Sequence, residues 1–289
     1  MREFIITTDS TVDLPKEYLD QQGNAVISLT YIMDGTTYKD MYGLPSKEFY
    51  DKVRGGALPT TTQLNPEEAK DLFQPLLEQG KDVLHLSFSS GLSGSYNSIR
   101  IAAEELREEY PDAKLIIIDS LSASMGGGML LYKANEQKAA GKTIDEIAEW
   151  LDVHRLKVCQ LFTVDDLNHL QRGGRLSKAA AVIGTMINIK PILCVNSEGK
   201  LVPIGKARGR KKSLSELVDG MDKQLGGYEN DIVMISHGDC LADAEALTEL
   251  VKERFNISNV MINPIGPVIG SHAGPGALAI FFIGNDRQG

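Results

Sequence analysis

The feature that most constrains the fold is the regular alternation of apolar strand-like runs with helical segments in the first half. Residues 115–118 form an unbroken apolar run, which is typical of a parallel strand covered on both faces. Further strand-like segments occur at residues 4–7 and 83–86, and apolar side chains at helical spacing predict a helix over residues 96–110. Strands that alternate with helices in this way predict a doubly wound, mainly parallel sheet in an α/β protein.

The second half has a different pattern. Segments 191–195 and 200–204, separated by a polar turn, predict a β-hairpin. We also expect strands at 160–164 and 232–236, two closing strands, and helices over 178–187, 213–225 and 242–255. We therefore divide the chain into an N-terminal α/β domain, residues 1–152, and a C-terminal mixed αβ domain, residues 153–289. The three glycines at 126–128 are expected to form a turn before a helix over 129–140.

Charge and cysteine usage exclude several classes of protein. The 289 residues carry a formal net charge of −9, which argues against general attraction to nucleic acid or anionic lipid. The three cysteines are widely spaced and read as reduced thiols. No signal peptide, membrane-spanning run, Walker motif or zinc motif is visible. We therefore expect a cytoplasmic protein without a cofactor or metal and with at most transient membrane contact.

Polar loops follow the strands of the first half at residues 8–11, 89–95 and 119–120. The carboxyl ends of parallel strands form the ligand crevice of an open sheet, and hydroxyls and helix N-terminal amides there suit an anionic group. Helix capping is the alternative for each loop, because Ser, Thr and Asp are preferred caps. The threonines at 60–62 offer further hydroxyl donors, with a capped loop as the equal alternative.

A serine hydrolase is the main alternative to a binding protein. Residues 91–95 resemble a G-x-S-x-G nucleophile elbow, but Ser95 replaces the last glycine. A hydrolase would use Ser93 with His272 as its base and an acid such as Asp9. His272 lies in the segment 266–276, which is rich in glycine and proline and is expected to form a shaped loop presenting the imidazole. A DNA-binding regulator acting through the basic cluster at 206–212 is a third reading.

Several motifs together resemble one family. Residues 8–14, TDSTVDL, are similar to the N-terminal T-D-S-T-x-D-L signature of the DegV family, and residues 89–96, SSGLSGSY, are similar to its S-S-x-L-S-G-T-Y loop. Residues 61–63, TTQ, stand where that family has T-S-Q-P-S. The segments at 119–120, 170–177, 189–193 and 272–276 follow in the family's order. The resemblance extends from residue 4 to about residue 283.

The resemblance implies a two-domain fatty-acid-binding protein, the binding subunit of a bacterial fatty acid kinase. Such a subunit holds a long-chain fatty acid such as palmitate, stearate or oleate between its domains. It presents the carboxylate to a separate kinase catalytic subunit, which forms the acyl phosphate used in phospholipid synthesis. The chain would then be a carrier without a complete active site of its own.

The resemblance also implies roles for particular residues. Thr61, Ser93 and His272 are expected to hold the carboxylate, Thr62 and Arg172 to lie in the head-group region, and Arg208 to contact the kinase partner. Thr62 departs from the serine usual in the family. The chain also has apolar residues that could line a slot for the tail: Ile27, Leu29, Met125, Phe162, Ile183, Met186, Ile187, Ile265, Val268 and Ile269.

Overall fold

A parallel sheet forms the first part of the molecule. The computed structural model describes residues 2–176, 188–285 and 287. Its parallel sheet has the strand order β2-β1-β6-β7, and the runs at 4–7, 83–86 and 115–118 are confirmed as strands. β6 is buried along its whole length, as expected for an inner strand of a covered sheet. The strand bounds are β1 (Phe4–Asp9), β2 (Ala25–Ile27), β6 (Asp82–Ser87) and β7 (Leu115–Asp119).

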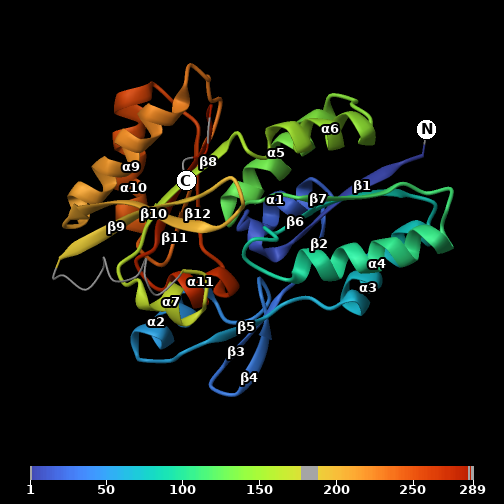
Figure 1. Ribbon diagram of the computed structural model, residues 1–289, viewed down its shortest axis with the longest axis horizontal. Coiled ribbons are helices and arrows are strands. Elements are labelled where there is room, and N and C mark those ends of the chain that lie inside the picture. The colour runs from blue at the N-terminus through green and yellow to red at the C-terminus, as the bar shows by residue number, and fades with distance from the viewer. Residues whose placement is uncertain (1, 177–187, 286, 288–289) are drawn as a thin grey trace.

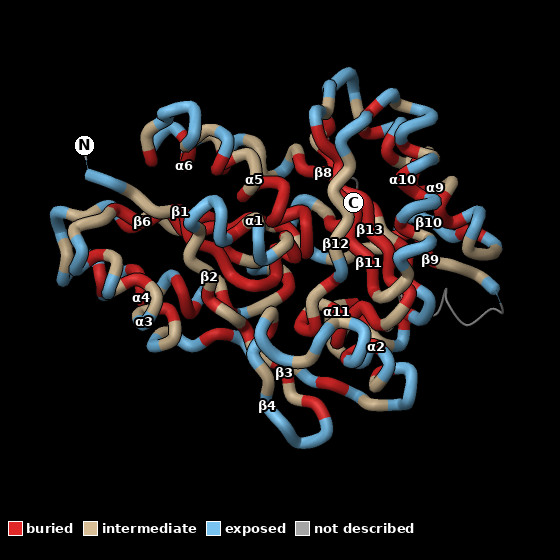
Figure 2. Tube along the Cα trace, turned by 180° about the vertical axis from the view of Figure 1, so that it is seen from behind, coloured by how far each residue is buried: buried red, intermediate tan, exposed pale blue. Residues whose placement is uncertain are grey.

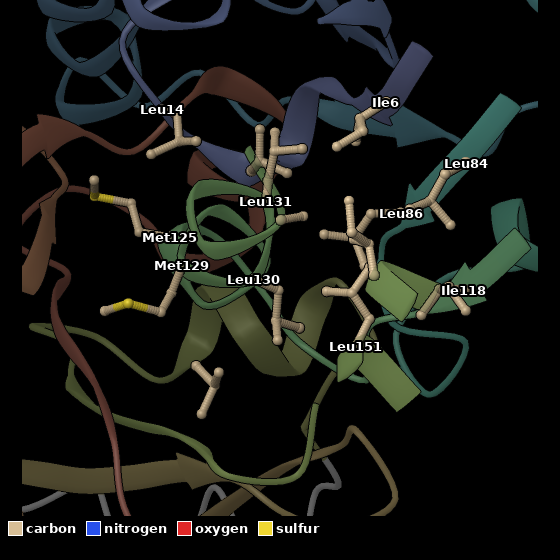
Figure 3. Packing of buried hydrophobic residues seen from close by; sticks show 14 of the residues in the cluster. Ile6, Leu14, Leu84, Leu86, Ile118, Met125, Met129, Leu130, Leu131 and Leu151 are labelled. Carbon is tan, nitrogen blue, oxygen red and sulfur yellow. The ribbon is translucent and has the colours of Figure 1, made fainter. Parts of the chain in front are cut away.

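Helices cover both faces of this sheet, which confirms the doubly wound arrangement. Side chains of α3 (Pro66–Glu78) and α4 (Ser95–Glu109) pack with Val83 on one face. Side chains of α5 (Met125–Ala139) and α6 (Ile144–His154) pack with Leu84 and Leu86 on the other, and Figure 3 shows this packing around α5. A shorter helix, α1 (Lys16–Gln21), and a 3-10 turn, η1 (Ser10–Val12), follow β1.

The expected turn at residues 126–128 is wrong. These glycines form the first turn of α5, which begins at Met125. A Cβ atom on Gly128 would lie 2.7 Å from the Val12 carbonyl oxygen, and one on Gly126 would lie 2.5 Å from the Gln160 side chain. The glycines are therefore explained by close packing of the helix start rather than by a turn.

The second sheet has six strands in the order β10-β9-β8-β13-β11-β12, and only β11 and β12 run parallel to each other. The predicted hairpin is confirmed by the antiparallel pairing of β9 with β10. Helices α9 and α10 cover one face, whereas the predicted helix at 178–187 lies outside the described residues. The bounds are β8 (Val158–Thr163), β9 (Ile189–Val195), β10 (Leu201–Arg208), β11 (Val233–His237), β12 (Val260–Pro264), β13 (Leu278–Ile283), α9 (Arg210–Leu225) and α10 (Leu241–Phe255).

A small antiparallel sheet was not predicted. It has the order β4-β3-β5 and projects from the lower edge of the molecule in Figure 1. Its strands are β3 (Thr30–Met33), β4 (Thr36–Lys39) and β5 (Thr60–Thr62), and α2 (Ser46–Arg54) lies between β4 and β5 in the chain. The threonine segment at 60–62 is thus a strand rather than a capped loop.

The segment around His272 also differs from expectation. Residues Pro267–Ala273 form the helix α11, not a loop. Pro267 occupies the first turn, where its missing N–H costs nothing and its fixed φ favours the helix. Gly274, with φ 75°, follows the last residue, so the glycine and proline content marks the two ends of a short helix.

The two large sheets share one hydrophobic core through α5. This helix contacts β1 and β6 on one side and β8, β11 and β13 on the other, and buried residues run continuously through this region in Figure 2. The predicted domain boundary at residue 152 falls in the last turn of α6 and stays a prediction. Among the described helices, none combines the length and apolar character needed to cross a bilayer.

Candidate functional site

An apolar cavity lies where the parallel sheet, the mixed sheet, β5 and α11 meet. About 860 Å³ of space there is free of protein atoms, a figure that includes the open mouth. Most of its wall is aliphatic or aromatic. The apolar lining residues are Leu29, Phe88, Leu92, Ala123, Leu161, Phe162, Leu170, Val195, Leu201, Ile265, Val268, Ile269, Ala273, Ala277, Leu278, Ala279 and Phe281.

Five of the ten apolar residues that the sequence suggested for the slot line this cavity: Leu29, Phe162, Ile265, Val268 and Ile269. Ile27 and Met125 belong instead to the packed core on either face of the parallel sheet. Ile183, Met186 and Ile187 lie outside the described residues.

Thr61 and His272 form the centre of a polar group in the cavity wall. The Oγ1 atom of Thr61 in β5 lies 2.8 Å from Nε2 of His272 in α11. Burial lowers the pKa of His272 to about 4, and the charges of Arg175 and Arg172 act in the same direction. The imidazole is therefore neutral near pH 7. Its Nδ1 atom is buried and has no hydrogen-bond partner among the described residues.

Ser93 reaches the same cavity from the loop between β6 and α4. Its Oγ atom lies 2.9 Å from the hydroxyl of Ser95 and accepts a 3.2 Å hydrogen bond from the Ser95 backbone N–H. Two buried aspartates hold the loop from behind. Asp9 accepts from the backbone N–H of Phe88 at 2.7 Å, and Asp119 accepts from that of Ser90 at 3.1 Å. The loop thus presents the Ser93 hydroxyl in a fixed position.

The carboxylates in the polar loops serve as structural caps. Asp9 accepts from both the backbone N–H and the hydroxyl of Thr11, and burial raises its pKa. None of its hydrogen bonds involves His272, so the Asp9 that the hydrolase reading nominated as the acid does not orient that imidazole. Capping, the alternative for these loops, explains the aspartates, whereas Ser93 faces the cavity.

Thr62 and Arg172 occupy different positions. Thr62 lines the cavity, and its hydroxyl pairs with that of Thr30 on the neighbouring strand. Arg172 ends α7 (Asn168–Arg172) and is exposed, and its guanidinium lies 3.0 Å from Nδ1 of His169. It is not among the residues that line the cavity, although its charge acts on His272.

Arg175 is a cavity residue that the sequence reasoning did not single out. Its Nε donates to the Leu92 carbonyl at 3.0 Å and its Nη1 to the Gly173 carbonyl at 2.6 Å. Burial lowers its pKa. Both arginines belong to the RGGR motif at residues 172–175, inside the segment 170–177 named above, and only the second lies beyond the end of α7.

Arg208 lies outside the cavity. It is the last residue of β10 and is exposed. Other members of the basic cluster are paired within the chain: Arg210 with Asp243 at 3.0 Å, and Lys212 with Glu216 at 3.1 Å. These ion pairs neutralise part of the cluster's charge, which weakens the nucleic-acid reading.

The geometry bears on two kinds of catalytic site, a metal centre and a serine–histidine pair. In residues 2–176, 188–285 and 287, no group of three His, Cys, Asp or Glu side chains is placed to hold a metal ion. Ser93 and His272 line one cavity, but their hydrogen bonds go to Ser95 and Thr61. Beside the cationic Arg175, the site therefore offers neutral hydrogen-bond donors and acceptors at the wall of an apolar cavity.

Comparison with known proteins gives a consistent result. Residues 3–285 match a family described as the DegV family of uncharacterised proteins. A DegV domain-containing protein of Clostridium perfringens is 44% identical over the full length of both chains.

Comparison with solved structures gives the same family. A DegV family protein from Thermus thermophilus, described as fatty-acid-binding, is 31% identical with a TM-score of 0.88, covering 99% of this chain and 100% of that one. A stearic-acid-binding protein from Eubacterium ventriosum is 26% identical with a TM-score of 0.88, covering 97% and 98%. The matches extend over both sheets and confirm the predicted fold. The chain belongs to the DegV family.

Proposed function

We propose that this protein binds one long-chain fatty acid, such as palmitate, stearate or oleate, in the cavity. The observation that carries the proposal is an apolar cavity whose wall also holds Thr61, Ser93 and His272. A palmitate tail has about 14 methylenes, worth about 11 kcal/mol if fully buried at roughly 0.8 kcal/mol each. Ordering and translational costs reduce that figure considerably. The tail supplies the affinity, and the polar group fixes the carboxylate.

The carboxylate is held by Thr61, Ser93 and His272, with Thr62 and Arg172 in the surrounding head-group region. A buried carboxylate needs hydrogen-bond donors, and two hydroxyls and a neutral imidazole provide them. Arg175 already donates its Nε–H and one Nη1–H to backbone carbonyls, so the bidentate fork that uses Nε is not available. Neutral donors leave electron density on the carboxylate, as a phosphoryl acceptor requires.

The protein acts as a carrier and not as an enzyme. A separate kinase catalytic subunit phosphorylates the bound carboxylate in the cytoplasm, and the acyl phosphate enters phospholipid synthesis. Arg208 is exposed on the edge strand β10 and contacts this partner. The support for this step is the resemblance of the motifs to the binding subunit of a fatty acid kinase.

Mass spectrometry of the purified protein tests the binding function. We expect a near one-to-one fatty acid that is released on denaturation. Ser93→Ala should lower the retained fraction, whereas Ser90→Ala, which removes an exposed hydroxyl of the same loop, should not. A protein that stays empty after incubation with a range of fatty acids would overturn the proposal.

Two further assays separate the carrier from its alternatives. A serine-directed phosphonate should leave Ser93 unlabelled, and covalent labelling with ester turnover would favour the hydrolase. Acyl phosphate should form only when ATP and a fatty acid kinase catalytic subunit are added. Arg208→Ala should slow that step without changing fatty acid binding.

A further inference from the structure

A second polar group lies in the cavity wall, formed by Ser124, directly before α5, and Ser236, in β11. Their Oγ atoms are 2.9 Å apart. Ser124 also hydrogen-bonds a carboxyl oxygen of Asp13, which lies behind it. None of these three residues shares a hydrogen bond with Thr61, Ser93 or His272 in the part of the chain that the structure describes. The two serines are thus separate from the polar group of Thr61, Ser93 and His272 in the same wall.

Asp13, Ser124 and Ser236 form a chain of hydrogen bonds, and the number of protons available leaves Ser236, at its end, with unused hydrogen-bonding capacity. Each serine has one hydroxyl proton, so Ser124 cannot donate to Asp13 and Ser236 at once. Burial raises the pKa of Asp13 well above its usual value, which favours the neutral acid. The protonated Asp13 then donates to Ser124 and Ser124 donates to Ser236, so the hydroxyl proton of Ser236 has no acceptor. If Asp13 is ionised, Ser236 donates to Ser124 and Ser124 donates to Asp13, so the lone pairs of the Ser236 oxygen have no donor.

In either order, the hydroxyl of the fully buried Ser236 has hydrogen-bonding capacity that no other described residue takes, because Ser124 is the one described partner of that hydroxyl. Its neighbours toward the mixed-sheet wall are apolar: Ala279 is its partner on β13, and Phe281 and Phe162 line the same cavity, whereas Asn263 is its partner on β12. A plain alkyl chain gains nothing from a hydroxyl at this place, and buried polar groups ordinarily find partners.

Building on the fatty-acid function proposed above, we infer that Ser236, supported by Ser124 and Asp13, is a subsite for a hydroxyl group carried part-way along the ligand's chain. The ligand class is therefore long-chain hydroxy fatty acids. A hydroxyl both donates and accepts, so it fits either order of protons at Ser236. Burying that hydroxyl against a wholly apolar wall would instead cost affinity.

The test compares stearic acid with a set of positional hydroxystearic acids, measured by displacement of a fluorescent fatty acid from the full chain. In the unmodified protein we expect one isomer to bind at least as tightly as stearate and the others about tenfold more weakly. Ser236→Ala should weaken the favoured isomer by about tenfold and leave stearate within about twofold. Thr163→Val is the matched control, because it removes a buried hydroxyl of the same sheet that does not line the cavity.

The outcomes separate this inference from the function on which it rests. If stearate binds but all hydroxy isomers are equally weakened in both the unmodified protein and Ser236→Ala, the subsite is absent and the carrier function stands. If no fatty acid binds, both proposals fail. If Thr163→Val produces the same isomer-specific loss as Ser236→Ala, the effect comes from altered sheet packing and the subsite is rejected.

Discussion

Thr61 and His272 are 211 positions apart in the sequence, yet the threonine Oγ1 and the imidazole Nε2 are 2.8 Å apart. The contact joins the small antiparallel sheet to α11. Because these two elements come from distant parts of the chain, the geometry of the polar group depends on how both dock onto the rest of the molecule.

We expect Thr61→Val to weaken fatty acid binding by about tenfold, because it removes one hydrogen bond to the carboxylate and one to His272 while keeping the side-chain shape. The neighbouring Thr60→Val is the matched control, since Thr60 is exposed on the same strand and does not line the cavity. Calorimetric titration with palmitate measures both. Equal affinities for the two variants would contradict the assignment of Thr61.

The titration of His272 should report ligand binding. Its pKa is about 4 in the folded protein, below the usual 6.5, because burial disfavours the charged ring. This preference for the neutral ring contributes stability that is present above pH 6.5 and is lost as the pH falls toward 4. A bound carboxylate should raise the pKa. Imidazole NMR shifts measure it, and a protonated ring at pH 6 without ligand would refute the environment described.

Buried carboxyls should make the protein less stable as the pH rises. Burial raises the pKa of Asp40 to about 7, and no ion pair in the described residues includes it. The folded state keeps a proton that the unfolded state releases near pH 4, so the contribution of Asp40 to the free energy of unfolding should fall between pH 4 and pH 7 and level off above, opposite in sign to the contribution of His272. The fall is on the order of 4 kcal/mol.

Asp40→Asn should flatten this slope, as measured by urea unfolding at several pH values. The raised pKa of Asp13 acts in the same direction and should leave part of the slope in place. The exposed Asp112→Asn is the control. A slope that does not change in Asp40→Asn would show that this carboxyl is already ionised at low pH.

Gly173 should tolerate no side chain. A Cβ atom there would lie 2.0 Å from Nδ1 of His272, so Gly173→Ala should push the imidazole away from Thr61. We expect fatty acid affinity to fall about tenfold and stability to fall by about 1–3 kcal/mol. Gly205→Ala, whose Cβ would be 3.7 Å from Ile192, is the control and should bind normally.

Substitutions of the two arginines of the RGGR motif, Arg172 and Arg175, should differ in their effect on fatty acid affinity. Arg175→Gln removes hydrogen bonds to the carbonyls of Leu92 and Gly173 and so loosens the loop that presents Ser93. Arg172→Gln removes an exposed charge. Fatty acid affinity should therefore fall more for Arg175→Gln, as measured by fluorescent displacement, and a larger loss for Arg172→Gln would reverse the assignment.

The sequence allowed the covered strands to be predicted because they are rich in apolar residues, most clearly in the continuous apolar run of β7. It did not reveal β5, because its three threonines favour a strand but show no alternation of apolar and polar residues that would mark a buried face. Similarly, α11 was hidden by the glycines within and around it, of which Gly270 inside the helix is required because a Cβ there would meet the Tyr50 hydroxyl at 2.6 Å. Such close approaches arise only in the folded molecule.

The candidate site likewise contains some residues that the sequence could predict and others that it could not. Thr61, Ser93 and His272 could be named from motifs and line one cavity. Arg175 and the pair of Ser124 and Ser236 could not, because their significance depends on which side chains face the cavity. That orientation is decided by the docking of α5 and α11 and not by local sequence.

The position of α5 limits how a ligand can enter. Met125 and Met129 of this helix share one buried core with Leu84 of the parallel sheet and with Phe281 of the mixed sheet. Hinging the sheets apart would expose these side chains, at about 1.5–3 kcal/mol for each. The two sheets and α5 therefore hold together as one frame, and a ligand must reach the cavity without the sheets parting.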